Sequence, residues 1–287
     1  MAKYIGTYAN SGDVQTALNE QELQRPFIAY TTDNEGVIFG AVGDKAEVGD
    51  IVVYSVADDL LHYIKQAEYS ASTYPVADYV PVGVVVSPQA DDVFSGASGE
   101  ITFMGLNWLD KNNPDIGNVN SQRIEWGYDN FEIPELTNYG NVQGAITDMN
   151  GKANTEAVLQ YATAQTNWRT DSAITFTNAA GYYPVFECAW RYHTSGTVQG
   201  DWYVPACGQL YFLQSNTEEL AKLNAGFTAV GVPVYNFSSS ARGTSTEKDL
   251  KSYAFYMHST GISFYTKSDN GYFSTRPYCS KLMTRLK

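Results

Sequence analysis

The sequence lacks long hydrophobic runs. Its 287 residues contain no stretch of about 20 consecutive apolar side chains, the length that a membrane-spanning helix requires. The opening residues Met1–Gly6 also lack an apolar stretch of the length found in secretory signal peptides. We therefore expect a protein that is made in the cytoplasm and does not insert into a membrane.

The sequence is also poor in cysteine and histidine, with three of each. An odd number of widely spaced cysteines argues against a disulfide framework, and the histidines do not stand at the spacing of zinc ligands. We expect buried, structural cysteines and no metal centre among these six residues, which are Cys188, Cys207, Cys279, His62, His193 and His258.

Basic residues are scarce. The 18 lysines and arginines stand against 31 aspartates and glutamates, which gives a net charge of −13. Such a surface repels phosphate backbones and anionic lipids, so we expect no binding to nucleic acid. Tyrosine, by contrast, is abundant at 22 residues. This abundance fits two interpretations, namely tyrosines placed on strands, which favour aromatic side chains, and tyrosines on a contact surface.

Common catalytic motifs are missing as well. The sequence contains no Gly-x-Ser-x-Gly elbow, no phosphate-binding loop and no His-Glu-x-x-His zinc motif. The acidic pairs Asp91-Asp92 and Glu218-Glu219 are neighbours in sequence, and nothing in the pattern sets them across a substrate. We therefore predict that the protein is not an enzyme.

Residues 1–42 form a segment that is too short to bury a good core. Residues 4–8 and 27–30 have the composition of strands, and the apolar residues between them have the spacing of a short helix. We expect this segment to gain its missing core from a neighbouring molecule, while the alternative is an ordinary hairpin packed on the rest of the chain. The expected anchor side chains are Tyr4, Ile5, Val14, Leu18, Phe27 and Ile28.

From Gly43 onward the pattern becomes mixed α+β. Runs of β-branched and aromatic residues predict strands, and apolar residues three and four positions apart predict helices. Pro184, inside one predicted helix, indicates a kink or a later start. The expected strands are residues 48–54, 80–86, 101–106, 234–239, 252–258, 262–266 and 272–278, and the expected helices are residues 154–164, 177–192, one after Pro205 and one beginning at Thr217.

One short stretch joins a strand to a helix beside a tryptophan. Residues 201–204 have a strand pattern, and Pro205 ends strand pairing because it has no backbone N–H. Leu210 and Leu213 then fall at helical spacing. We therefore expect the Trp202 side chain to be buried under this turn.

Four pieces of the sequence resemble, in the same order, the C-type-lectin-like domains of bacterial and phage proteins, a branch related in fold to the formylglycine-generating enzyme. They are Thr147–Glu156, Gly200–Leu213, Tyr235–Ser240 and Arg276–Cys279. The resemblance implies an α+β C-type-lectin-like fold over residues 43–287, with two main helices against twisted antiparallel sheets. It implies no oxidase activity, because the enzyme's two closely spaced cysteines have no counterpart here.

The N-terminal segment resembles that of structural fibre proteins from crAss-like phages of gut Bacteroidales, over Tyr4–Tyr8 and Asp13–Leu18. The resemblance implies a homo-oligomeric head or tail fibre that is made in the host cytoplasm and ends in the virion. Residues 1–42 would bind other virion proteins, and the lectin-like domain would contact a host-surface glycan or protein or decorate the capsid. The alternative is an exported bacterial surface adhesin with the same domain.

Two regions supply the expected ligand contacts, because aromatic rings stack on sugar faces and polar groups bind hydroxyls. Packing inside an oligomer is the alternative for the tyrosines among them. The acid- and amide-rich stretch Asn107–Asn141 is expected to be a solvated loop, with Ca²⁺ binding, as in C-type lectins, as the alternative. The expected contact residues are Trp126 and Tyr128 in this loop, and Arg242, Tyr256, His258, Tyr265 and Tyr272 in the last β region.

Overall fold

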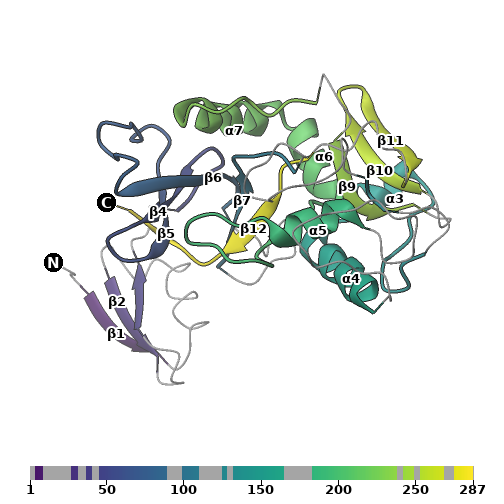
Figure 1. Cartoon of the computed structure of the whole chain (residues 1–287). Coiled ribbons are helices and arrows are strands. Elements are labelled where there is room, and N and C mark those ends of the chain that lie inside the picture. Colours follow the sequence, from purple (N-terminus) through teal and green to yellow (C-terminus); the bar gives the residue numbers. More distant parts are fainter. Residues whose placement is uncertain are drawn as a thin grey trace. The chain divides into compact units, whose positions relative to one another are not determined.

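The chain divides into two compact units, Met1–Lys45 and Ala46–Lys287, which are drawn in Figure 1. The domain boundary predicted from the sequence, between residues 42 and 43, lies beside this division. The computed structural model describes residues 4–8, 27–31, 37–40, 45–88, 99–109, 125–127, 132–164, 183–237, 242–248, 253–267 and 275–286.

The first unit contains a three-stranded sheet in the order β1-β2-β3. β1 (Tyr4–Tyr8) pairs in parallel with β2 (Phe27–Thr31), and β2 pairs antiparallel with β3 (Val37–Gly40). The strands predicted at residues 4–8 and 27–30 are confirmed, and β3 is an addition. A parallel pair needs a long crossover connection, which residues 9–26 provide.

The expected anchor side chains fall outside what the structure describes. Residues 14 and 18, in the predicted helix, are not among the described residues. For the four anchor residues on β1 and β2, the backbone alone is described. The anchor role of all six residues therefore stays a prediction, for Tyr4, Ile5, Val14, Leu18, Phe27 and Ile28.

The second unit is a mixed α+β structure built on a seven-stranded sheet in the order β13-β5-β4-β6-β7-β12-β8. Its central strands are buried on both faces, which suits their near-continuous β-branched and aromatic residues. The strands are β4 (Ile51–Ser55), β5 (Leu60–Ile64), β6 (Tyr79–Ser87), β7 (Ile101–Gly105), β8 (Trp202–Tyr203), β12 (Tyr278–Lys281) and β13 (Thr284–Arg285).

A smaller sheet has the order β11-β10-β9, with β10 (Tyr253–His258) paired antiparallel to β11 (Gly261–Thr266) and to β9 (Arg242–Glu247). The sequence predicts β10 and β11 but not β9. The reason is that β9 is Arg-Gly-Thr-Ser-Thr-Glu, without an apolar side chain, although all six of its residues are buried. Hydrogen bonds, rather than apolar contacts, hold this strand in the interior.

Two predicted strands are wrong in the parts that the structure describes. Residues 234–237 are not a strand, because the Asn224 side chain takes both backbone groups of Tyr235: its Oδ1 accepts from Tyr235 N (2.7 Å) and its Nδ2 donates to Tyr235 O (2.9 Å). Residues 275–277 are not a strand either, and pairing begins only at Tyr278, directly after Pro277. A proline has no N–H to offer a sheet.

Five helices are present in the described part of this unit, and α7 lies along β6 in Figure 1. Pro184 is the first residue of its helix, so the later start is confirmed. The helix predicted from Asn154 begins earlier, because Asn154 binds another side chain instead of capping. The helices are α3 (Val142–Ala145), α4 (Gly151–Thr163), α5 (Pro184–Arg191), α6 (Cys207–Ser215) and α7 (Thr217–Ala229).

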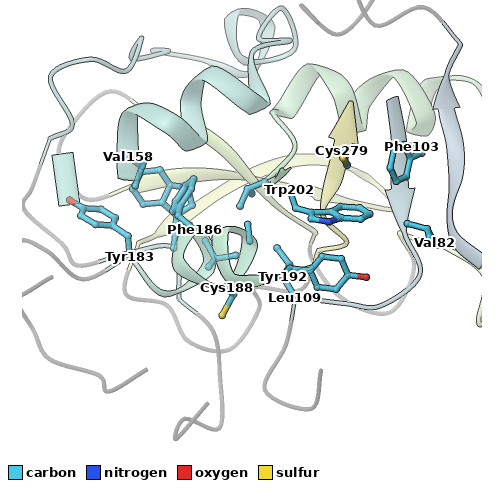
Figure 2. Packing of buried hydrophobic residues seen from close by; sticks show 14 of the residues in the cluster. Val82, Phe103, Leu109, Val158, Tyr183, Phe186, Cys188, Tyr192, Trp202 and Cys279 are labelled. Carbon is cyan, nitrogen blue, oxygen red and sulfur yellow. The ribbon is translucent and has the colours of Figure 1, made fainter. Parts of the chain in front are cut away.

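The core surrounds Trp202, whose predicted burial is confirmed at 1% exposure. Figure 2 shows the indole between Phe103 and Tyr192, whose rings meet it edge-on at centroid distances of 5.2 and 4.7 Å. The indole Nε1 donates to Thr197 Oγ1 (3.0 Å), which satisfies its polar atom inside the core. All three cysteines are buried as well, as expected for structural residues.

Candidate functional site

Two of the four resembling sequence pieces, residues 147–156 and 200–213, meet around Asp148, which is 2% exposed. Its Oδ2 accepts from Asn154 Nδ2 (2.8 Å) and from Thr246 Oγ1 (2.7 Å) on β9. Its backbone oxygen accepts from Gly208 N (2.9 Å), while Thr246 Oγ1 accepts from Cys207 N (2.8 Å). We call Asp148, Asn154, Thr246, Cys207 and Gly208 the Asp148 junction. It fixes the starts of α4 and α6 against β9.

Glycine is required in this junction for close backbone approach. A Cβ on Gly208 would lie 2.5 Å from both Asp148 O and Ile146 O, closer than any side chain tolerates. The fourth piece joins through the sheet, where Cys279 and Tyr278 of β12 pair with Trp202 and Tyr203 of β8. These three pieces, residues 147–156, 200–213 and 276–279, are therefore parts of one scaffold and not separate binding loops.

Two buried arginines surround Trp108. The guanidinium carbon of Arg242 lies 4.2 Å from the Trp108 ring centroid, and that of Arg276 lies 4.8 Å from it and 4.1 Å from the Phe227 ring. Tyr235 stacks on Trp108 at 5.4 Å. Burial lowers the pKa of Arg276 to about 10, so its guanidinium group remains charged at neutral pH. Burial lowers the pKa of Arg242 as well. Cation–π contacts stabilise these charges in the interior.

A buried ion pair lies at the end of the smaller sheet. Lys267 Nζ contacts Glu247 Oε1, and both side chains are fully buried. Lys267 Nζ also lies 4.6 Å from the Trp126 ring centroid, and Trp126 Nε1 donates to Thr244 O (2.9 Å) on β9. Burial raises the pKa of Glu247, although the charge of Lys267 opposes the shift. This pair and Trp126 hold residues 125–127 against the sheet.

Three of the expected ligand contacts are wrong as surface residues. Trp126 and Tyr256 are 0% exposed and Arg242 is 4% exposed, so none of them offers an aromatic or polar group to a molecule outside. Their side chains pack in the interior because each satisfies an internal partner: Lys267, Tyr265 and Trp108, respectively. Tyr128 and Tyr272 lie outside the described residues.

The remaining two expected contacts lie together on the β10–β11 hairpin. His258 and Tyr265 are both half-buried, and their ring centroids are 5.6 Å apart. Tyr265 also meets buried Tyr256 edge-on at 5.3 Å. The hairpin turn passes through Gly261, whose φ of 135° favours glycine. This half-exposed His258–Tyr265 pair is the part of the predicted contact surface that the structure brings together at the surface.

Sequence reasoning missed two buried clusters: the Glu247–Lys267 ion pair, and the two arginines beside Trp108. Glu247 and Lys267 are 20 positions apart, and no local pattern marks them as a pair. Trp108 and Arg276 belong to segments whose contact requires the complete fold. Lysine and arginine are rarely fully buried. The sequence alone therefore gives no sign of these two buried clusters.

No group of three or more histidine, cysteine, aspartate or glutamate side chains is arranged to hold a metal ion within the described ranges. Much of the stretch 107–141, where Ca²⁺ is the alternative, lies outside those ranges. In the same ranges, no helix is both long enough and apolar enough to cross a membrane.

Acid is expected to destabilise the protein through His258. Burial lowers the pKa of this imidazole below its ordinary value of 6.5. The unfolded chain therefore binds a proton at His258 before the folded chain does, and the free energy of unfolding falls as the pH drops below about 6.5. His258→Gln keeps the backbone oxygen that accepts from Gln214 Nε2. Urea unfolding between pH 7.5 and 5 should give a flatter pH dependence for this variant; parallel curves for variant and wild type would contradict the expectation.

Comparison of the chain with models of protein families, with curated proteins and with solved structures finds no match.

Proposed function

We propose that this chain is a structural protein of a phage virion, a head or tail fibre, that carries a C-type-lectin-like unit for contact with a host-surface glycan or protein. The fold part of the proposal is supported by the Asp148 junction. Residues singled out by the resemblance, Asp148, Gly208 and Trp202, are those on which the packing of α4, α6 and β8 depends. If the resemblance to the C-type-lectin-like family were due to chance, there would be no reason for these residues to hold the packing together.

The attachment part is supported by the first unit. Its described backbone is one three-stranded sheet within 45 residues, so it has little material for a core of its own. β1 and β3 are the outer strands of this sheet, and outer strands offer N–H and C=O groups for pairing with another chain. The proposal is that these strands bind a virion protein or a sister subunit.

The binding part rests on a rigid scaffold that presents surface side chains. Among the expected contacts that the structure describes, the half-exposed His258 and Tyr265 are the candidates that remain for contact with a ligand. The acidic chain, with its net charge of −13, favours a neutral or basic host molecule over a polyanion.

Removal of residues 2–45 is expected to abolish assembly without unfolding the rest. The second unit has two hydrophobic clusters of its own, so residues 46–287 should remain soluble with a cooperative melting transition. Light scattering should give an oligomer for the full chain and a monomer for the truncated chain. A truncated chain that keeps the oligomeric state, or that fails to fold, contradicts the attachment role.

Mass spectrometry of purified virions tests the location directly. Peptides of this chain at a level comparable to other structural proteins support the virion proposal. Detection on the surface of uninfected bacteria, and absence from virions, would favour the exported adhesin instead.

A further inference from the structure

The β4–β5 hairpin and the C-terminal strand bring together a hydroxyl, an imidazole and a carboxylate. His62 Nδ1 lies 3.2 Å from Thr284 Oγ1, and His62 Nε2 lies 2.9 Å from Asp58 Oδ2. Asp58 and His62 are four positions apart, whereas Thr284 is distant in sequence and is set directly beside His62 by the parallel pairing of β13 with β5. The sequence pattern gives no sign of this arrangement.

The hydrogen bonds define which nitrogen carries the proton. An ionised carboxylate accepts only, so Asp58 Oδ2 accepts from the Nε2–H of His62, and the tautomer that acts as a base carries its proton on Nε2. Nδ1 then has its lone pair directed at Thr284, whose hydroxyl donates to it. This is the arrangement of a nucleophile, a general base and a group that orients the base. The base atom is Nδ1, with the carboxylate on Nε2.

Asp58 is itself held in place. The side chain of Ser55, which is 2% exposed, donates to the Asp58 carboxylate, and this bond and the one from His62 lower the Asp58 pKa. The turn that carries Asp58 continues through Asp59 at φ 61°, a conformation that aspartate tolerates. Tyr54 OH donates to Asp59 Oδ1 (2.6 Å) and fixes that turn.

The hydroxyl and its base differ in exposure in the way that a surface reaction needs. His62 is 7% exposed, so bulk water has little access to the imidazole. Thr284 is exposed on a two-residue strand, and Leu282, two positions earlier, is 72% exposed and provides an apolar neighbour. The hydroxyl therefore faces solvent while its base is shielded.

We propose that Thr284 is a nucleophile activated by His62, with Asp58 as the positioning residue, and that it reacts with an uncharged carboxylic ester carried on a larger molecule. The class of substrate follows from two features: Thr284 lies on an open strand that a bulky molecule can reach, and the acidic chain disfavours anions. This activity is separate from the proposed virion role and does not depend on it.

The reaction has two balanced steps. In the first, Thr284 Oγ1 attacks the carbonyl carbon as His62 Nδ1 takes its proton; the ester C–O bond breaks, and the leaving alcohol takes that proton from His62. In the second, a water molecule gives a proton to His62 and attacks the acyl carbon, the bond to Thr284 Oγ1 breaks, and the threonine hydroxyl recovers the proton. The sum is ester plus water giving acid plus alcohol, without a redox change.

The test is covalent labelling of the full chain with a fluorophosphonate probe, which replaces its fluoride with the nucleophile oxygen. Tandem mass spectrometry should locate the adduct on Thr284. His62→Gln should lower the labelling rate by about 100-fold, the usual lower contribution of a general base. Thr284→Ser should label faster, because it keeps the hydroxyl and loses the methyl group beside it. Asp58→Asn should lower the rate, and Asp58→Glu should recover part of it.

Controls separate reactivity from folding. Thr284→Val alters an exposed side chain and removes one hydrogen bond to His62, so it should still fold with a cooperative melting transition and lose the adduct. Thr228→Val removes another exposed threonine hydroxyl, which donates to Asn224 O, and should leave labelling unchanged. The proposal is overturned if wild type carries no adduct on Thr284, or if His62→Gln labels at the wild-type rate.

Discussion

Trp202→Ala is expected to lower the free energy of unfolding by about 3–5 kcal/mol, the usual cost of truncating a large buried aromatic side chain. The substitution removes the edge-on contacts with Phe103 and Tyr192 and leaves a cavity beside β7 and β12. It also leaves the buried Thr197 hydroxyl without the indole N–H that donates to it. Since domains are stable by only about 5–15 kcal/mol, the loss should be large in a urea titration.

A matched control is Trp190→Ala, because Trp190 is half-buried and the Nε1 edge of its indole lies near Gly200. Its truncation should cost clearly less than that of Trp202. Thr197→Val isolates the hydrogen bond from the packing and should cost about 1 kcal/mol. Equal losses for Trp190→Ala and Trp202→Ala would show that the indole of Trp202 is not the centre of the core.

The elements that the sequence predicts well are those in which local pattern and burial agree. β6 and β7 have nearly continuous apolar residues, and the strand–turn–helix at Pro205 has both a stop signal and helical spacing. β10 and β11 follow the same rule. In each of these elements the residue pattern alone indicates that the element is buried. The prediction therefore does not depend on which segments pack against it.

The elements that the sequence mispredicts depend on distant partners. β9 is polar and is buried because Thr244, Thr246 and Glu247 find acceptors and donors on other segments. Residues 234–237 have strand composition, yet Asn224 takes the backbone groups of Tyr235 that a ladder would use. In both cases hydrogen bonds to groups on another element determine the local structure.

The same limit explains the errors in the candidate site. An aromatic residue in a polar loop suits a sugar surface and a buried cation–π contact equally well. Trp126 makes the second kind of contact, with Lys267, and Arg242 makes it with Trp108. Composition cannot distinguish the two, because the partner in each cation–π contact is contributed by another segment.

Lys267→Met is expected to lower the free energy of unfolding by about 3–5 kcal/mol, because it leaves Glu247 as an unpaired charge in the interior. Burial already raises the Glu247 pKa above its ordinary value of 4.5 with Lys267 present. Without Lys267 the carboxyl should bind a proton still more readily in the folded state. The variant should therefore be least stable near neutral pH and recover part of its stability, relative to wild type, as the pH falls toward 4.5.

The double variant Lys267→Met/Glu247→Leu decides what the pair contributes. Two apolar side chains in place of a buried ion pair are often neutral or stabilising, so the double variant should regain most of the loss and show no recovery in acid. Urea titrations of wild type, Lys267→Met, Glu247→Leu and the double variant at pH 7 and pH 5 give the coupling energy. If the double variant is as unstable as Lys267→Met, the loss does not come from the stranded Glu247 charge. Lys267 would then act mainly through its contact with Trp126, and residues 125–127 would be held to the sheet by that cation–π contact rather than by the ion pair.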